Sequence, residues 1–124
     1  MKITIIGLGL IGGSLAMDLR KSKFATELIG VDASEKHAEQ ALKIGLVDRI
    51  EDLENGVKNT DIVIIAIPVD KEVSILSKIL DLINNNTTVI DMSSTKRVIV
   101  ESVRNNPKRK NFVPAHTMSG TANT

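Results

Sequence analysis

The sequence predicts a doubly wound α/β domain with a parallel sheet, and three observations support this. Apolar, strand-like stretches alternate along the chain with helical segments of about ten to fifteen residues. Residues 62–67 are apolar at every position, which is typical of a central parallel strand covered by helices on both faces. The length of 124 residues suits one domain with a core of its own and is too short for two full domains.

The first unit is a strand followed by a helix. Residues 2–6 are mostly β-branched and end at Gly7, so they are expected to form a strand. Residues 10–21 are expected to form a helix because apolar residues recur at helical spacing, namely Leu10, Ile11, Leu15 and Leu19. Residues 27–31 are expected to form the second strand, which ends at Asp32.

The second helix is bounded by two residues with clear local preferences. Ser34 is a good N-cap for a helix over 35–44, and Gly45 is placed to end it. A short edge strand over 47–50 and a short helix over 51–58 are expected to follow.

The second half repeats the alternation. Pro68 ends the apolar strand, and a helix over 70–84 follows with an apolar stripe. The remaining elements are expected to be a strand over 87–91, a helix over 95–105 and a strand over 112–115. Right-handed crossovers and two helical layers give the strand order 3-2-1-4-5-6, with the switch point between the first and fourth strands.

Composition excludes several classes of function. The net charge is +1 and the only aromatic residues are Phe24 and Phe112, so a nucleic-acid surface is not expected. The absence of cysteine excludes disulfides and thiolate sites and fits a reducing cytoplasm. The uncharged run after Lys2 resembles a signal peptide, but glycines interrupt it, and no apolar run approaches membrane-spanning length. We therefore expect a cytoplasmic protein without a membrane partner.

A glycine-rich turn lies between the first strand and the first helix. Gly7-Leu8-Gly9-Leu10-Ile11-Gly12 is a GxGxxG sequence, a weak signal alone but a strong one between a strand and a helix. Gly7 permits the tight turn, Gly9 leaves room for a pyrophosphate, and Gly12 lets the helix pack on the strand. The N–H groups that open the helix, at Leu10 and Ile11, then face the phosphates. This pattern predicts a Rossmann-type dinucleotide site.

Asp32 completes this fingerprint, because it lies twenty residues beyond Gly12 at the end of the second strand. Its carboxylate would accept hydrogen bonds from the adenosine ribose and repel a 2′-phosphate, so NAD is favoured over NADP. The alternative is a glycine-rich turn in an unrelated α/β domain with a solvated Asp32.

Polar residues follow the carboxyl ends of the later strands, where open parallel sheets bind ligands. Pro68 follows the fourth strand, Ser94 the fifth and His116 the last. His116 could accept a proton from a substrate hydroxyl as hydride leaves the same carbon, and Ser94 could orient it. Simpler interpretations stay open: Ser94 could be only a helix N-cap, and His116 only a surface residue.

Three further features have structural interpretations. His37 lies within a helix among polar residues and is expected to be solvated. The basic run 108–110 follows Pro107 and is expected to be a solvated loop. No cluster of carboxylate and histidine residues has metal-ligand spacing, so no metal is expected.

Three segments together resemble one known family. VIDMSSTK (89–96), FVPAHTMSGT (112–121) and IGLGLIGGSLA (6–16) resemble the nucleotide-binding domain of prephenate dehydrogenases, whose relatives include arogenate and cyclohexadienyl dehydrogenases. The resemblance spans essentially the whole chain. It implies oxidative decarboxylation of prephenate or arogenate in tyrosine biosynthesis, with hydride transfer to NAD.

The resemblance also implies roles for residues. His116 matches the histidine that hydrogen-bonds the ring hydroxyl, Ser94 the serine that links this histidine to the nicotinamide region, and Thr121 a threonine of the same loop. Three positions depart from the usual family segment: Thr117, Ser119 and Ala122, the last where glutamate is frequent. The family's helical second domain supplies much of the substrate pocket and the dimer interface, and it is not expected within residues 1–124. The resemblance also implies that the parent protein is a homodimer.

Three rival functions stay open at this level. Another dehydrogenase of the β-hydroxyacid or 6-phosphogluconate type would place a catalytic lysine in a helical domain and would not depend on His116. A non-catalytic NAD-sensing module would need the glycine loop and Asp32 but not Ser94 and His116. A methyltransferase also uses a glycine-rich first turn and an acidic second strand end.

Overall fold

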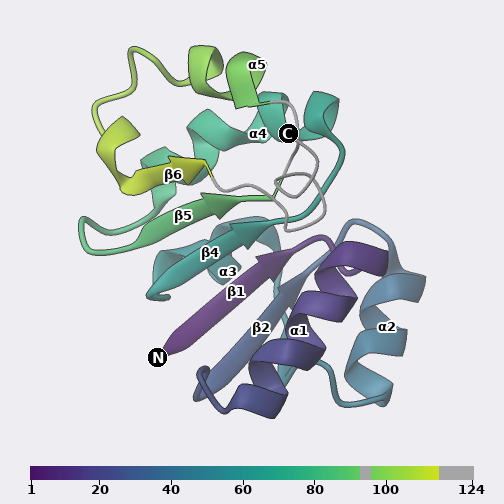
Figure 1. The fold of residues 1–124 in the computed structure, drawn as a ribbon. Coiled ribbons are helices and arrows are strands. Elements are labelled where there is room, and N and C mark those ends of the chain that lie inside the picture. The colour runs from purple at the N-terminus through teal and green to yellow at the C-terminus, as the bar shows by residue number, and fades with distance from the viewer. Residues whose placement is uncertain (93–95, 115–124) are drawn as a thin grey trace, which may run out of the picture.

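The computed structural model describes residues 1–92 and 96–114, which form one parallel sheet with helices on both faces (Figure 1). Six strands pair in the order β3-β2-β1-β4-β5-β6, as the sequence predicts. The strands are β1 (Lys2–Ile6), β2 (Glu27–Val31), β3 (Arg49–Ile50), β4 (Ile62–Ile65), β5 (Thr88–Asp91) and β6 (Phe112–Pro114). The helices are α1 (Leu10–Ser22), α2 (Glu35–Lys43), α3 (Leu53–Lys58), α4 (Val69–Leu82) and α5 (Lys96–Ser102), with a 3-10 turn over Arg109–Asn111.

The centre of the sheet is formed by β1 and β4, which pair in parallel with Ile3 beside Ile62 and Ile6 beside Ile65. Three of the four β4 residues are buried, so the prediction of a central strand is confirmed. The strand ends at Ile65, two residues before the predicted end. The backbone still bonds there, because the Ala66 N–H donates to the Ile6 carbonyl at 2.8 Å. The central strands therefore end together, at the glycine turn.

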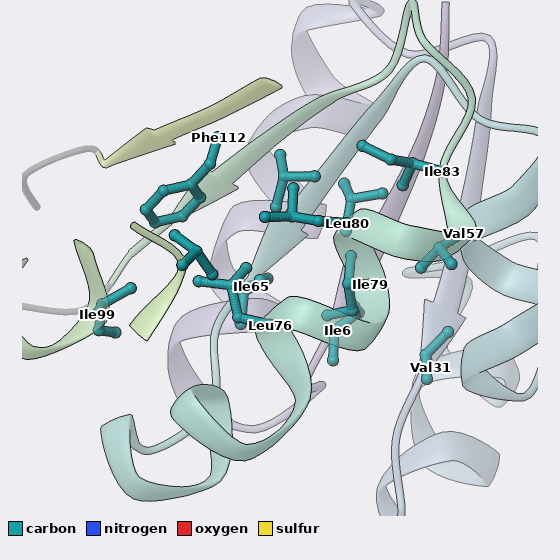
Figure 2. Packing of buried hydrophobic residues seen from close by; sticks show 13 residues of the cluster. Ile6, Val31, Val57, Ile65, Leu76, Ile79, Leu80, Ile83, Ile99 and Phe112 are labelled. Atoms are coloured by element: carbon teal, nitrogen blue, oxygen red, sulfur yellow. The ribbon is translucent and has the colours of Figure 1, made fainter. Parts of the chain in front are cut away.

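Two hydrophobic cores lie on the two faces of the sheet. On one face α1 and α2 cover residues of β1 and β2, including Ile3, Ile5 and Leu28. On the other face α3, α4 and α5 pack on β4 and β5, and Figure 2 shows this larger cluster around Leu76, Leu80 and Ile99. None of the helices in the described part of the chain combines the length and apolarity that crossing a bilayer requires.

The first helix differs from its predicted apolar stripe. Its buried residues are Gly12 and Ala16, with Leu15 and Leu19 packed at the edge of the core. Leu10 is 91% exposed and Ile11 53% exposed, so neither contributes to the core. Gly12 is buried because the helix starts so close to the end of β1 that a Cβ there would lie 1.7 Å from the Gly7 carbonyl oxygen.

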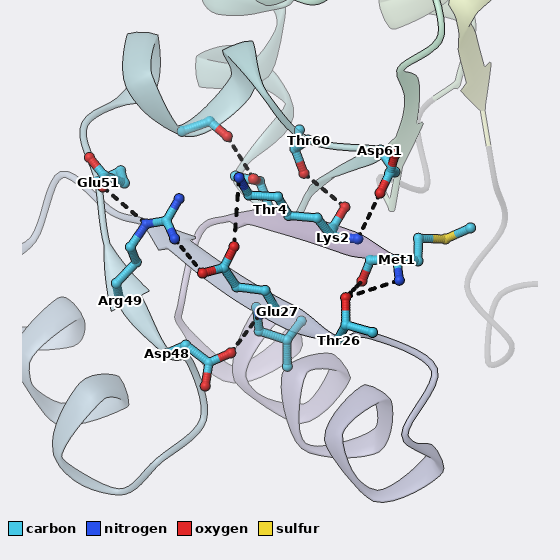
Figure 3. A network of polar contacts seen from close by, with 12 residues as sticks. Met1, Lys2, Thr4, Thr26, Glu27, Asp48, Arg49, Glu51, Thr60 and Asp61 are labelled. Carbon is cyan, nitrogen blue, oxygen red and sulfur yellow. Dashed lines mark hydrogen bonds and ion pairs between the residues drawn. The ribbon is translucent and has the colours of Figure 1, made fainter.

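At their amino ends, the strands are tied together by the protein's own polar groups (Figure 3). The Lys2 N–H donates to the carboxylate of Asp61, and the Leu28 N–H donates to that of Asp48, both at 2.8 Å. The Thr60 hydroxyl donates to the Lys2 carbonyl at 2.9 Å. At this end of the sheet, the backbone groups are therefore bonded to the protein's own side chains.

The basic run is more structured than the solvated loop that its composition predicts. The Lys108 ammonium donates to the Ile83 carbonyl, at the end of α4. The Arg109 guanidinium donates to the Arg104 carbonyl at 2.8 Å. Both side chains satisfy backbone carbonyls left free where helices end, and this is a structural role.

Candidate nucleotide-binding site

Two glycines of the loop are required by the fold itself. Gly7 has φ +97°, and a Cβ there would lie 2.5 Å from the Ala66 carbonyl oxygen. A Cβ on Gly12 would lie 1.7 Å from the Gly7 carbonyl oxygen, where no side chain fits. Both contacts are with backbone, which cannot move aside cheaply. The roles predicted for Gly7 in the turn and for Gly12 in close packing thus have a direct steric cause.

Gly9 differs from these two. Apart from its chain neighbours, a Cβ at this position would meet no atom of residues 1–92 and 96–114 within 4 Å, and its φ of −75° is accessible to any residue. Within the described part of the chain, neither sterics nor φ explains a glycine at this position. It leaves open space in front of the first turn of α1, the place where a dinucleotide fold receives a pyrophosphate.

The amino end of α1 is free to meet an anion. Gly9 occupies the N-cap position, no side chain of the described residues caps this helix, and its first turn contains no acidic residue. The first intrahelical bond is donated by Gly13 to Gly9 at 2.8 Å. The N–H groups of Leu10 and Ile11 precede it and lie in the first turn, where donors have no partner within the helix. The prediction for these two residues concerns their backbone N–H groups, since their side chains are exposed.

Asp32 is held rigidly at the end of β2. Its Oδ2 accepts the Leu8 N–H at 2.7 Å and its Oδ1 accepts the Ser34 N–H at 2.8 Å. The side chain is 11% exposed, so the alternative of a solvated aspartate is wrong. Each oxygen keeps a lone pair for a further donor, and the backbone bonds fix the direction in which it is presented.

His37 is exposed, as its polar neighbours predict, and it also lines the cleft beside Asp32. It lies in the first turn of α2, and its N–H donates to the Oγ of the N-cap Ser34 at 3.3 Å. The imidazole is 52% exposed, and its Nδ1 lies 3.4 Å from Oδ2 of Asp32. Counting one helical turn from Ser34 could have revealed this, because a side chain there returns toward the residue that precedes the cap.

The glycine turn, Asp32 and α4 enclose one cleft of about 810 Å³. Four residues predicted for the cofactor line it: Gly7, Gly9, Asp32 and Pro68. Val31, Ala33, Ile67 and Ile75 add apolar surface. The wall is completed by two residues of α4, Lys71 and Ser74, and by residues 51–53 at the start of α3. No sequence pattern pointed to these residues. A cleft of this volume, with mainly apolar lining and a few polar side chains, suits a cofactor.

The predicted catalytic residues Ser94 and His116, and Thr121 of the same loop, lie outside the described residues. In the described part, β5 and β6 are adjacent and parallel, with Asp91 paired to Pro114. The strands that precede Ser94 and His116 therefore end side by side. No group of three or more carboxylate or histidine side chains in the described ranges could hold a metal ion.

Comparison with known proteins identifies one family. The model of the prephenate dehydrogenase nucleotide-binding domain matches residues 15–124. The prephenate dehydrogenase of Bacillus subtilis (strain 168) is 38% identical over 126 residues, which cover 98% of this chain and 34% of that protein. The chain thus spans about a third of the length of this relative.

Solved structures agree in fold and family. The crystal structure of prephenate dehydrogenase from A. aeolicus, in complex with hydroxyphenyl propionate and NAD+, is 29% identical with a TM-score of 0.85. It covers 97% of this chain, which spans 43% of that one. Synechocystis arogenate dehydrogenase is 34% identical with a TM-score of 0.75, over 84% of this chain and 37% of that one. With the family model matched over most of its length, this chain belongs to the nucleotide-binding domain family of the prephenate dehydrogenases.

Proposed function

We propose that the cleft beside the glycine turn binds NAD. The observation that carries the proposal is Gly9, where a Cβ would meet no atom of the described residues although the other two glycines of the motif are sterically required. The glycine is explained if a ligand, rather than the protein, occupies that space. The A. aeolicus relative, which was crystallised with NAD+, supports this choice of ligand.

The residues present fit such a cofactor. The uncapped first turn of α1 would hold the pyrophosphate through backbone N–H groups. Asp32 would accept hydrogen bonds from the ribose hydroxyls, and its negative charge would disfavour a 2′-phosphate. Ile67, Pro68 and Ile75 would contact the adenine through an apolar wall of the cleft.

For the protein as a whole we propose the oxidative decarboxylation of prephenate or arogenate. Both substrates occur among the names of the relatives, prephenate in Bacillus subtilis and arogenate in Synechocystis. Loss of hydride and of CO2 makes the ring aromatic, which provides the driving force. Bound NAD supplies the hydride acceptor.

We assign the proton transfer to His116 by family resemblance. Its imidazole would hydrogen-bond the ring hydroxyl and take its proton as the carbonyl of the ring forms. Ser94 would orient this imidazole, and Thr121 would belong to the loop that contacts the substrate. Ala122 stands where an acidic residue is frequent in the family, so the side chain at this position cannot take part in charge recognition of the substrate.

A helical domain outside these 124 residues is part of the proposal, and it would complete the substrate pocket and the interface of a homodimer. The chain spans only 34% of the Bacillus subtilis protein, which leaves length for such a domain in that relative. The 124-residue chain alone is then expected to turn over substrate poorly, because positioning both reactants contributes about 7–11 kcal/mol to catalysis.

Calorimetric titration of the 124-residue chain tests the cofactor assignment. NAD is expected to bind, with NADP weaker, because Asp32 lies at the ribose end of the cleft. Binding of S-adenosylmethionine without NAD would indicate a methyltransferase and overturn the proposal. Equal affinity for NAD and NADP would overturn the role of Asp32.

A further inference from the structure

The imidazole of His37 lies next to the carboxylate that is expected to select the cofactor. Its Nδ1 is 3.4 Å from Oδ2 of Asp32, within ion-pair distance, and the structure records no hydrogen bond between them. The two side chains differ in environment, since Asp32 is nearly buried and His37 is half exposed at the mouth of the cleft. His37 is therefore open to protons from solvent while it touches a fixed negative charge.

Asp32 presents its charge with only neutral donors bound to it. Its two oxygens accept backbone N–H groups from Leu8 and Ser34, which carry no net charge. The only cationic side chain within ion-pair distance of this carboxylate in the described part of the chain would be the protonated form of His37. Protonation of His37 thus changes the net charge of the pair from −1 to 0.

From this geometry we infer that His37 makes the choice between NAD and NADP depend on pH. When the imidazole is neutral, Asp32 repels a 2′-phosphate and the site selects NAD. When the imidazole is protonated, it offsets the charge of Asp32 and offers a cation to the phosphate. This inference rests on the proposed function, because it concerns the ribose end of the same cleft.

The other charged groups of the cleft do not provide such a switch. The carboxylate of Glu51 pairs with Arg49 at 3.1 Å, and that of Asp52 caps α3 through the Asn55 N–H at 2.8 Å. Lys71 lies on the α4 wall, and Glu35 and Lys36 precede His37 on α2. Of these side-chain types, only imidazole ordinarily changes its charge between about pH 5 and 8.

The test is the ratio of the Kd for NADP to the Kd for NAD, measured by calorimetry on the chain from about pH 8 to about pH 5.5. The 2′-phosphate of NADP gains a proton near pH 6 and changes this ratio by itself. His37→Gln provides the reference, because it keeps this contribution of the ligand and also keeps His116, the other of the two histidines. As the pH is lowered from about 8 to about 5.5, we expect the Kd ratio to fall about fivefold more in the wild type than in His37→Gln. This is the size of effect expected for a partly exposed charge pair.

Two further variants sharpen the result. In His37→Lys the ratio of the Kd for NADP to the Kd for NAD is expected to be low at every pH. The change of this ratio with pH should equal that in His37→Gln, because the charge of the lysine does not change. Lys36→Gln removes a neighbouring cation that does not line the cleft, and it is expected to keep the wild-type slope. Thermal melts check that each variant is folded.

Equal slopes for the wild type and His37→Gln would overturn this inference while leaving the binding of NAD intact. Failure of the wild type to bind NAD at any pH would overturn both the inference and the proposed function. If Lys36→Gln loses the wild-type pH dependence of the Kd ratio, the effect would belong to the combined charges of α2. That result would also overturn the role of His37.

Discussion

The backbone N–H of Leu8 donates a 2.7 Å hydrogen bond to Oδ2 of Asp32, which joins the glycine turn to the end of the neighbouring strand. The two halves of the dinucleotide fingerprint are therefore one structural unit. Oδ1 of the same carboxylate accepts the Ser34 N–H, so it also fixes the turn that starts α2. A residue expected to bind the ribose thus holds the loop expected to bind the phosphates.

This double role predicts that Asp32→Ala lowers both stability and affinity. A partly buried backbone donor left without an acceptor costs about 1–3 kcal/mol, and two lose theirs here. The Kd for NAD is expected to rise about ten- to a hundredfold through loss of the charged acceptor. Urea unfolding and calorimetry well below the melting temperature measure the two effects separately.

Asp32→Asn is the matched variant for charge. Its amide keeps one oxygen acceptor, but its NH2 must face either the Leu8 or the Ser34 N–H, so one backbone bond is lost. The preference for NAD over NADP is expected to shrink because the repelling charge is gone. An unchanged preference in this variant would contradict electrostatic selection by Asp32.

Gly12→Ala is predicted to lower stability, whereas Gly9→Ala is predicted to lower the affinity for NAD and to leave stability unchanged. Gly12→Ala places a methyl group against the Gly7 carbonyl and is expected to destabilise the domain by about 3 kcal/mol or more. The methyl group of Gly9→Ala meets no atom in the part of the chain that the structure describes, and this variant is expected to keep a melting temperature within a few degrees of wild type. Its Kd for NAD should nevertheless rise at least about tenfold, because the methyl group occupies the space of the pyrophosphate. Tight NAD binding by a stable Gly9→Ala variant would refute the proposed phosphate site.

The pH dependence of stability is expected to include a contribution from Asp48. The Leu28 N–H and then the Arg20 guanidinium, 3.0 Å away, hold the pKa of this carboxyl below its ordinary value of 3.8 (Figure 3 shows the Asp48 side chain). A carboxyl with a lowered pKa in the folded state stabilises the fold above its unfolded pKa, and this stabilisation is lost as the pH falls through the folded value.

Asp48→Asn is therefore expected to be less stable than the wild type at pH 7, by no more than about 1 kcal/mol because the pair is exposed. The difference should shrink as the pH falls below about 4 and passes through the lowered pKa of the folded-state carboxyl, because Asp48 then becomes neutral like the asparagine. Urea unfolding from about pH 2 to 7 measures it, with Arg20→Gln as the partner variant of a double-mutant cycle. A constant difference at every pH would attribute the effect to packing instead.

The fold could be predicted from the sequence because local and long-range signals agree. Strand order followed from the alternation of elements, and the boundaries of α2 from Ser34 and Gly45, which has φ +79° in the structure. Periodicity failed at Leu10 and Ile11, where the approach of α1 to β1 requires glycine and alanine instead.

The candidate site was predictable only in part. The glycine turn and Asp32 are read from spacing within one stretch of chain. The place of His37, one helical turn after Ser34, could have been found by counting along α2. The contribution of Lys71 depends on how α4 stands over the ends of other strands, which no local pattern records. The carbonyl partners of Lys108 and Arg109 were missed for the same reason, because they belong to other segments.

Two predictions concern the reaction of the full-length protein. His116→Asn is expected to lower kcat by about 10²–10⁴-fold, the usual loss when a positioned base is removed. An amide can hydrogen-bond the ring hydroxyl but cannot accept its proton near pH 7. The Kd for NAD should barely move, because the proposed affinity depends on the glycine turn and Asp32. Steady-state kinetics and cofactor titration on the same preparation measure the two quantities.

Ser94→Ala distinguishes orientation of the base from simple helix capping. If Ser94 positions His116, kcat should fall less than in His116→Asn, and the pH profile of kcat should shift, since the environment of the base changes. If Ser94 only caps the helix that follows, stability should fall by about 0.5–2 kcal/mol while kcat and its pH profile stay at wild-type values. Wild-type kcat in His116→Asn across about pH 6–9 would remove the catalytic assignment altogether. Over most of that range an imidazole is ordinarily neutral and could act as a base, so loss of the base should lower kcat there. The glycine turn and Asp32 would then account for a domain that binds a dinucleotide and leaves the proton transfer to residues elsewhere in the protein.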